Sequence, residues 1–158
     1  MATQEEKEKN YFNKIISHYD KISENLENGD KIDENIDYFM EIIQIIMWGE
    51  KNKQIFFDFF IEQKILNLFV TLAKINRKNN DSKENAIKLI KLYSLFLLNL
   101  KSVEIINYVY SHSNFNNFLN LQFDFEDDDI VSYYVNCVKS LSQKFNEFPF
   151  QIFYNAVS

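Results

Sequence analysis

Apolar residues recur along this chain at spacings of three and four, with few interruptions. One such stripe, in residues 10–26, consists of Tyr11, Ile15, Ile16, Tyr19, Ile22 and Leu26. This spacing places the apolar side chains on one face of an α-helix. The chain contains only two glycines and one proline, too few for a protein built from many turns and strands. The pattern therefore predicts an all-α fold.

The same periodicity divides the chain into successive helices. We expect helices over residues 10–26, 32–48, 54–63, 64–75, 84–100, 103–112, 114–121, 130–145 and 150–157. The apolar stripe of the second helix is wide, which implies neighbours on more than one side, and Gly49 is expected to end it. The polar run at residues 76–82 is the clearest predicted loop. Ser82, three residues before Asn85, gives only a weak capping signal.

A repeat underlies this order of helices. Sliding the chain by 50 residues superimposes Glu34–Ile36 on Glu84–Ala86, and about forty positions then align without a gap. A looser third copy begins at Ile130, where Tyr134 takes the place of Leu89. Helical hairpins that repeat every 40–50 residues or so are typical of armadillo/HEAT-like stacks, because one hairpin cannot bury its apolar face alone.

The repeat predicts one helical-repeat domain over residues 1–158, an armadillo/HEAT-like right-handed stack of helical hairpins. Its units are expected at about residues 30–79, 80–126 and 127–158, the last one incomplete. The alternative is an irregular helical bundle, in which chance apolar periodicity imitates a repeat.

Charge and composition disfavour several classes of protein. A net charge of −6 argues against a nucleic-acid partner, since phosphate-binding surfaces need an excess of Lys and Arg. The one cysteine, Cys137, can form neither an internal disulfide nor a structural zinc site, which favours a reducing compartment. The N-terminal MATQEEKEKN lacks the apolar core of a signal peptide. No transmembrane segment is expected, because residues 92–100 are too short and residues 105–123 contain five asparagines.

The strongest candidate for chemistry is FDFEDDDIVSYY, residues 123–134, in which five acids occupy six positions. They are Asp124, Glu126, Asp127, Asp128 and Asp129. An EF-hand calcium loop needs a central glycine and a distal glutamate, and this segment contains no glycine. The free N–H groups and the dipole at a helix N-terminus, by contrast, favour carboxylates. The segment is therefore interpreted as the start of a helix, with a cation site as the alternative.

The other catalytic candidates are His18, His112 and Cys137. Neither histidine has a Cys, His or acid at a metal-ligand spacing such as H-x-x-x-H. A nucleophilic triad needs Ser or Cys, a base and an orienting acid in one place, and nothing in the sequence indicates such a meeting. Cys137 lies on a crowded helix, which favours a buried structural thiol. The sequence thus predicts no enzyme, no catalytic, cofactor-binding or metal-binding residue, and no cofactor.

The aromatic segment FFDFFIEQ, residues 56–63, has two interpretations. Aromatic residues at i, i+3 and i+4 are more often core than the lining of a ligand pocket, so we expect a core helix. The flanking Lys51, Lys53 and Lys64 leave weak peripheral binding to a membrane surface as an alternative.

Four stretches together resemble the N-terminal FPL domain of the endosomal-maturation-defective (Ema/Gop-1) family. They are IIMWGEKNKQIFFDFFIEQKIL, LQFDFEDDDIVSYYVN, VKSLSQKFN and FQIFYNAV, at residues 45–66, 121–136, 138–146 and 150–157. In the family, a helix ends in Trp-Gly and is followed by an acid, a short polar turn and an F-D-F-F-like helix. An F-D-F motif with an acidic turn and paired tyrosines, then K-x-L-S and F-Y-N elements, follow in the same order and spacing. The resemblance covers most of the chain.

Two departures from the family pattern matter. At the position of Glu126 the family has a small hydroxyl residue suited to capping a helix, so Asp124 or Asp127 is expected to cap instead. The family's domain also continues with further helices, whereas this chain stops at Ser158. The chain therefore resembles either a short paralogue or a fragment of a family member.

The resemblance implies a non-catalytic protein-interaction adaptor or scaffold in endosomal membrane trafficking and autophagy. The implied partners are tethering-complex subunits, Rab-type GTPase machinery and ubiquitin ligases. The implied location is the cytoplasm, with peripheral association at endosomal or lysosomal membranes. The alternative function is a structural subunit of a large protein assembly, derived from the same domain. The sequence itself identifies no binding surface and no specific partner.

Overall fold

The computed structural model describes residues 3–28, 31–50, 53–79, 81–110 and 114–146. These residues form eight α-helices and no strand, so the all-α prediction is confirmed. The helices are α1 (Gln4–Glu27), α2 (Ile32–Glu50), α3 (Gln54–Glu62), α4 (Ile65–Asn79), α5 (Lys83–Asn99), α6 (Val103–Tyr110), α7 (Asn114–Leu119) and α8 (Asp128–Asn146). The expected helix at residues 150–157 lies outside the described residues.

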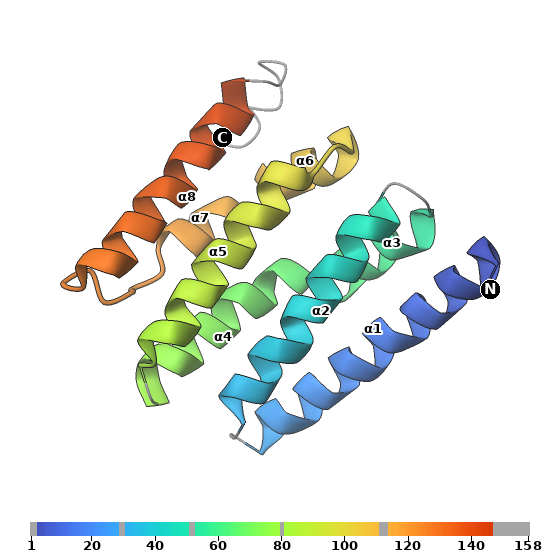
Figure 1. The fold of residues 1–158 in the computed structure, drawn as a ribbon, viewed down its shortest axis with the longest axis horizontal. Coiled ribbons are helices and arrows are strands. Elements are labelled where there is room, and N and C mark those ends of the chain that lie inside the picture. Colours follow the sequence, from blue (N-terminus) through green and yellow to red (C-terminus); the bar gives the residue numbers. More distant parts are fainter. Residues whose placement is uncertain (1–2, 29–30, 51–52, 80, 111–113, 147–158) are drawn as a thin grey trace.

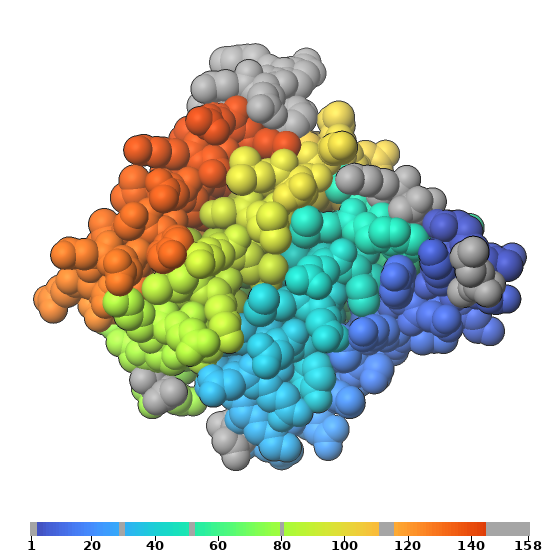
Figure 2. Space-filling model, in the orientation of Figure 1, coloured from blue at the N-terminus to red at the C-terminus, as the bar shows by residue number. Residues whose placement is uncertain are grey.

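The helices are arranged in two layers. In Figure 1 the four long helices α1, α2, α5 and α8 lie side by side across the front, and the shorter α3, α4 and α7 lie behind them. Helices α2, α5 and α8 run in the same direction, while α1 runs antiparallel to α2. Figure 2 shows the four long helices as adjoining bands on this face. The prediction of a helical stack is therefore confirmed.

The 50-residue offset between α2 and α5 has a counterpart in burial. The aligned pairs Asn35 and Asn85, Ile36 and Ala86, Phe39 and Leu89, and Ile46 and Phe96 are buried in both helices. Helix α8 packs against α5 and runs parallel to it, as α5 does to α2. The unit boundaries at about residues 30–79, 80–126 and 127–158 stay a prediction, as does the right-handed armadillo/HEAT-like form.

A row of aromatic rings crosses the interior from α2 to α8. Phe39 meets Phe69 edge to face with 4.5 Å between ring centroids, and Phe69 meets Tyr93 at 4.9 Å. Tyr93 stacks on Phe118 at 3.7 Å, and Phe118 faces Tyr134 at 6.4 Å. Aromatic pairs contribute about 0.5–1.5 kcal/mol each beyond the burial of their surface. The row therefore joins the two layers through packing that involves α2, α4, α5, α7 and α8.

Helix α1 begins at Gln4, so the expected start at Asn10 is wrong. The Thr3 hydroxyl accepts a hydrogen bond from the backbone N–H of Glu6 at 3.1 Å, and the Glu6 carboxylate accepts one from the N–H of Thr3 at 3.3 Å. This capping box satisfies two N–H groups that a helix terminus would otherwise leave free. The signature was present in the sequence as Thr-Gln-Glu-Glu.

Gly49 does not end α2, which continues to Glu50, so that expectation is wrong as well. Gly49 is buried where α3 turns back against α2. A Cβ atom at this position would lie 2.7 Å from the Cβ of Phe56. The glycine is therefore required by the close approach of Phe56, not by the geometry of a helix end.

The predicted loop at residues 76–82 is too long, because α4 extends to Asn79. Asn76 is 2% exposed, and its side-chain nitrogen donates a hydrogen bond to the backbone carbonyl of Ser82 at 3.0 Å. Ser82 is the N-cap of α5, where its hydroxyl accepts from the N–H of Asn85 at 3.2 Å. The polar residues of this run thus shape a tight corner between two helices.

Side-chain hydrogen bonds of two buried asparagines join α2, α4 and α5 at this corner. The side-chain nitrogen of Asn85 donates to the carboxylate of Asp33 at 2.6 Å and to the side-chain oxygen of Asn76 at 3.2 Å. Asn85 is 4% exposed. We call Asp33, Asn76 and Asn85 the amide network. It connects the starts of α2 and α5, which are neighbours in the front layer.

Candidate functional site

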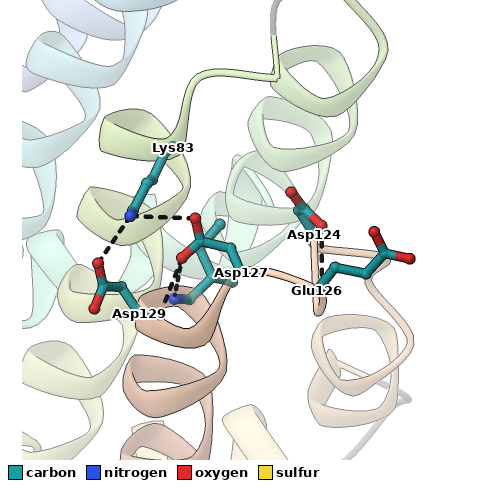
Figure 3. A network of polar contacts seen from close by, with 6 residues as sticks. Lys83, Asp124, Glu126, Asp127 and Asp129 are labelled. Atoms are coloured by element: carbon teal, nitrogen blue, oxygen red, sulfur yellow. Dashed lines mark hydrogen bonds and ion pairs between the residues drawn. The ribbon is translucent and has the colours of Figure 1, made fainter.

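The acidic segment at residues 124–129 leads into α8, as predicted for a helix start, although α8 begins at Asp128, two residues before the expected Ile130 (Figure 3). Asp127 accepts hydrogen bonds from the backbone N–H groups of Asp129 at 3.0 Å and Ile130 at 3.2 Å. The Ile130 hydrogen bond, assisted by the Lys83 ammonium, holds the pKa of Asp127 below its ordinary value despite an opposing effect of desolvation. Asp127 is therefore the cap of α8.

The acids that precede Asp127 have a local role. The Asp124 carboxylate accepts a hydrogen bond from the backbone N–H of Glu126 at 3.2 Å. In Figure 3 the Glu126 carboxylate points away from Asp127 and Lys83. Of the two candidates for replacing the family's hydroxyl residue, Asp127 takes the capping position.

Lys83, at the start of α5, bridges to the start of α8. Its Nζ lies 2.8 Å from the Asp129 carboxylate and 3.1 Å from that of Asp127 (Figure 3). The hydrogen bonds to Asp129 and Asp127 raise the pKa of Lys83. The Lys83 side chain is 49% exposed. We call Lys83, Asp127 and Asp129 the lysine bridge, and it connects two neighbouring long helices.

The geometry of the acidic segment favours a helix start over a cation site. The Lys83 ammonium lies between the Asp127 and Asp129 carboxylates, where a bound cation would have to sit. Within the described ranges, no group of three or more His, Cys, Asp or Glu side chains is placed to hold a metal ion.

His18 and Cys137 lie on α1 and α8, which are separated in the front layer by α2 and α5 (Figure 1). The His18 Nε2 atom contacts the Glu41 carboxylate on α2, and the His18 ring lies 4.9 Å from the ring of Tyr38. His112 lies outside the described residues. The structure therefore does not bring His18 and the thiol together.

Cys137 is fully buried, as predicted for a structural thiol. Burial raises the pKa of the Cys137 thiol to about 11, and a hydrogen bond with Ser94 on α5 offsets only part of that increase. A thiol with such a pKa is protonated at neutral pH, and the protonated form is a poor nucleophile. Cys137 therefore serves the packing of α8 against α5.

The aromatic segment at residues 56–63 belongs to the core, as predicted. Its buried rings are those of Phe56, Phe59 and Phe60. Of the flanking lysines, Lys53 forms an ion pair with Glu8 at 3.4 Å, and Lys51 lies outside the described residues. Among the helices that the structure describes, none is long and apolar enough to cross a bilayer.

A groove lies between α1 and α3. It has a volume of about 470 Å³ and is lined by Phe12, Ile16, Tyr19, Asp20, Ile55, Asp58, Phe59, Glu62 and Gln63. Ile16 and Ile55 are 37% and 46% exposed. The rings of Phe12 and Tyr19 each meet the ring of Phe59 edge to face at 5.9 Å. We call this recess the α1–α3 groove; its base is a packed aromatic cluster.

The α1–α3 groove is negatively charged. Asp20, Asp58 and Glu62 are exposed, and none of the other residues lining the groove is Lys, Arg or His. The sequence pattern does not indicate the groove, because its apolar residues continue the core stripes of both helices. Ile16, directly after the buried Ile15, was a usable signal, because one stripe of a helix cannot bury both residues fully.

A smaller pocket of about 190 Å³ lies between the end of α4 and the segment before α8. It is lined by Ala73, Lys74, Arg77, Lys78, Asn120, Leu121, Gln122 and Phe123. Three of these side chains are basic, although Arg77 already pairs with Asp81 at 2.5 Å. The surface of the stack therefore carries two recesses of opposite charge.

Comparison with known proteins identifies a family. The model of the FPL family, described as an uncharacterised conserved protein, matches residues 39–158. A CLEC16A homolog of Drosophila melanogaster is 29% identical over 114 residues, which make up 72% of this chain and 10% of that protein. Protein CLEC16A of Homo sapiens is 29% identical over 120 residues, covering 76% of this chain and 11% of that protein.

Protein TRANSPARENT TESTA 9 of Arabidopsis thaliana is similar as well, with 28% identity over 112 residues, 71% of this chain and 13% of that protein. The chain thus spans about a tenth of the length of these relatives. No solved structure matches it. The family match begins within α2 and includes the lysine bridge and the α3 wall of the groove. Since the match extends over well more than half of the residues, this chain belongs to the FPL family.

Proposed function

We propose that this protein is a protein-interaction adaptor that acts without catalysis in endosomal membrane trafficking and autophagy. The observation that carries the proposal is the FPL family match over residues 39–158. The four sequence stretches that resemble the Ema/Gop-1 family support the same role, because that resemblance implies an adaptor.

The geometry supports recognition of other proteins. The α1–α3 groove combines an aromatic base, exposed isoleucines and a rim of carboxylates. Apolar centres with polar rims are typical of protein–protein interfaces. Ring contacts of Phe12 and Tyr19 with Phe59 hold α1 against α3, so little ordering of the groove is needed on binding.

The proposed partners are tethering-complex subunits, Rab-type GTPase machinery and ubiquitin ligases. The proposed location is the cytoplasm, with peripheral association at endosomal or lysosomal membranes. Both follow from the resemblance and from family membership, and both belong to the same adaptor role.

Proximity labelling of the tagged full chain tests this role, because it reports compartment and neighbours together. We expect endosomal and lysosomal trafficking proteins to be enriched over a control in which the labelling enzyme is expressed alone. A labelling pattern identical to that control would contradict the proposal. Replacing Cys137, His18 and His112 together is expected to leave the neighbours unchanged, since none of these residues acts as a catalyst.

The second candidate is a structural subunit of a large assembly. It is favoured by exposed apolar side chains next to and on α8, where Phe125 and Val135 are each 42% exposed. Co-purification separates the two candidates. A stoichiometric complex that survives high salt indicates a structural subunit, whereas partners that are substoichiometric and released by salt indicate an adaptor.

A further inference from the structure

We propose that the α1–α3 groove binds a short basic amphipathic helix of a partner protein. The inference rests on the proposed function as an interaction module and names the chemistry of the partner. It is carried by the shape, the exposed apolar residues and the charge of one surface.

The length of the groove fits about two turns of a helix. Along α1 the groove runs from Phe12 to Asp20, and along α3 it runs from Ile55 to Gln63. Eight residues of an α-helix rise by about 12 Å, so both walls have the same length. A partner helix lying between two such walls would be contacted over about two turns. Docking of an apolar helix face into a groove is a common mode of recognition.

The apolar part of the partner is defined by the exposed isoleucines. Ile16 and Ile55 are 37% and 46% exposed, and they lie on opposite walls of the groove, on α1 and α3. Leucine, isoleucine or methionine at positions i, i+3 and i+4 of the partner would cover both side chains. Covering such side chains removes apolar surface from water, which contributes about 25 cal/mol per Å² before the costs of association.

The charge of the rim selects a basic partner. Asp20 lies on one wall and Asp58 and Glu62 lie on the other, so the carboxylates flank the apolar centre from both sides. Lysine or arginine residues beside the apolar face of the partner would meet opposite charges on both walls. An acidic helix or an anionic membrane surface would be repelled by the same three groups.

Two synthetic peptides test the proposal. The probe is a fluorescein-labelled peptide of about 18 residues with leucines at i, i+3 and i+4 and lysines at the flanking positions. The comparison peptide replaces every lysine with glutamate. By fluorescence anisotropy, we expect the basic peptide to bind the full chain at least about tenfold more tightly than the acidic peptide, with an affinity that falls as salt is added.

The first pair of variants tests the apolar contact. Ile16→Glu combined with Ile55→Glu places charges on both walls, and we expect binding of the basic peptide to weaken at least about tenfold. The matched control is Leu95→Glu combined with Leu98→Glu, because these leucines are 45% and 48% exposed on α5, outside the groove. The control is expected to bind like the original chain. Circular dichroism verifies that both variants fold.

The second pair of variants tests the charge of the rim. Asp20→Lys combined with Glu62→Lys reverses the charge of both walls and is expected to abolish binding of the basic peptide. The control, Asp37→Lys with Glu104→Lys, changes the net charge equally at exposed positions outside the groove. It is expected to retain most of the affinity, which separates a local effect from the overall charge of the chain.

Three results would overturn the inference. They are equal binding of the two peptides, unchanged binding by the Ile16→Glu and Ile55→Glu protein, and a dimer in sedimentation that this double variant dissociates. The last result would identify a second copy of the chain as the occupant. If the double variant keeps its proximity-labelling neighbours, the groove inference fails and the proposed function stands. If the original chain has no trafficking neighbours, the proposed function fails whichever way the peptides behave.

Discussion

Two neighbouring junctions of the front layer are connected by different chemistry. The amide network joins the starts of α2 and α5 through a hydrogen bond from Asn85, which is 4% exposed, to the exposed carboxylate of Asp33, and Asn76, which is 2% exposed, adds a buried contact to Asn85. The lysine bridge joins the starts of α5 and α8 through a side chain that is 49% exposed. Both contacts connect long helices at the same end of the layer, although the environments of the contacts differ.

The difference indicates which contacts hold the stack together. A buried amide that loses its partner keeps the full cost of having left water, whereas an exposed ion pair is solvated whether or not it forms. We therefore expect the amide network to matter for stability and the lysine bridge to matter little. At the α5–α8 junction, packing of Ile130, Cys137 and Leu141 must provide what the bridge does not.

The largest effect is expected for Leu141→Ala at the α5–α8 junction. Leu141 is 1% exposed, and truncation of a buried leucine typically lowers the free energy of unfolding by about 2–5 kcal/mol. Urea unfolding measures the loss, with Gln143→Ala on the exposed side of α8 as control. Labelling of Cys137 by a thiol reagent should accelerate in the variant, because α8 separates from α5 more often. If Leu141→Ala lowers the free energy of unfolding no more than Lys83→Met does, packing is not what holds the α5–α8 junction together.

Asn85→Ala is expected to have the next largest effect, at the α2–α5 junction. It leaves the buried Asn76 side chain without this partner, which costs about 1–3 kcal/mol in the free energy of unfolding. The control is Asn67→Ala, at an exposed position of α4, which should change the free energy of unfolding by no more than about 0.5 kcal/mol.

Replacing both asparagines sharpens this prediction. In the double variant Asn76→Leu with Asn85→Leu, no buried amide remains unpaired at this corner, while Asp33 is exposed and can be solvated. We expect the double variant to be more stable than the sum of the single losses predicts. An additive result in a double-mutant cycle would show that the contact between the two amides carries no coupling.

A smaller effect is expected for Asp127→Ala, and it should exceed that of Asp129→Ala. The Asp127 carboxylate both caps α8 and contacts Lys83. The Asp129 carboxylate contacts Lys83 but does not cap the helix. Asp127→Asn preserves the cap and is expected to unfold close to the original midpoint. Equal midpoints for the two alanine variants would mean that the cap contributes nothing.

The lowered pKa of Asp127 predicts that the stability of the fold depends on pH. The pKa of Asp127 is lower in the folded chain than its ordinary value of 3.8. Its contribution to stability is therefore complete above the ordinary pKa and is lost as the pH falls through the folded pKa. Thermal unfolding below pH 4 should show a smaller acid-induced decrease for Asp127→Asn than for the original chain.

The smallest effect is expected for Lys83→Met. The substitution keeps much of the side-chain length and removes only the exposed ammonium, so the unfolding midpoint should stay within experimental error. Added salt screens exposed ion pairs. It should likewise leave the unfolding midpoint of the original chain almost unchanged, because the screened pair contributes little to stability. A midpoint shift comparable to that of Asn85→Ala would contradict the distinction between the two junctions.

The helices themselves could be predicted from the sequence because their signals are local. Apolar spacings of three and four gave the long helices, and the acids before Ile130 indicated the start of α8. The capping box at Thr3 and Glu6 was equally local, but no apolar stripe accompanies it, so the start of α1 was placed too late. The buried Cys137 followed from its neighbours on the helix.

The features that could not be predicted depend on contacts between distant segments. Asn76 lies in the predicted loop and Asn85 in the first turn of a predicted helix, and only the packing of α4 against α5 and α2 supplies their side-chain partners. Gly49 looks like a helix end, and only the path of α3 reveals the approach of Phe56. The α1–α3 groove likewise arises between segments about 40 residues apart, so neither segment shows it alone.

The parallel course of α2, α5 and α8 has an electrical consequence. The partial positive charges of three helix N-termini add up along one edge of the molecule, since the helices do not alternate in direction. The chain neutralises this edge with its own carboxylates: Asp33 and Glu34 in α2, Glu84 in α5, and Asp128 and Asp129 in α8. In other proteins, helix N-termini attract phosphates and other anions. Because carboxylates neutralise the three N-termini here, this edge offers little attraction to phosphates or acidic lipids.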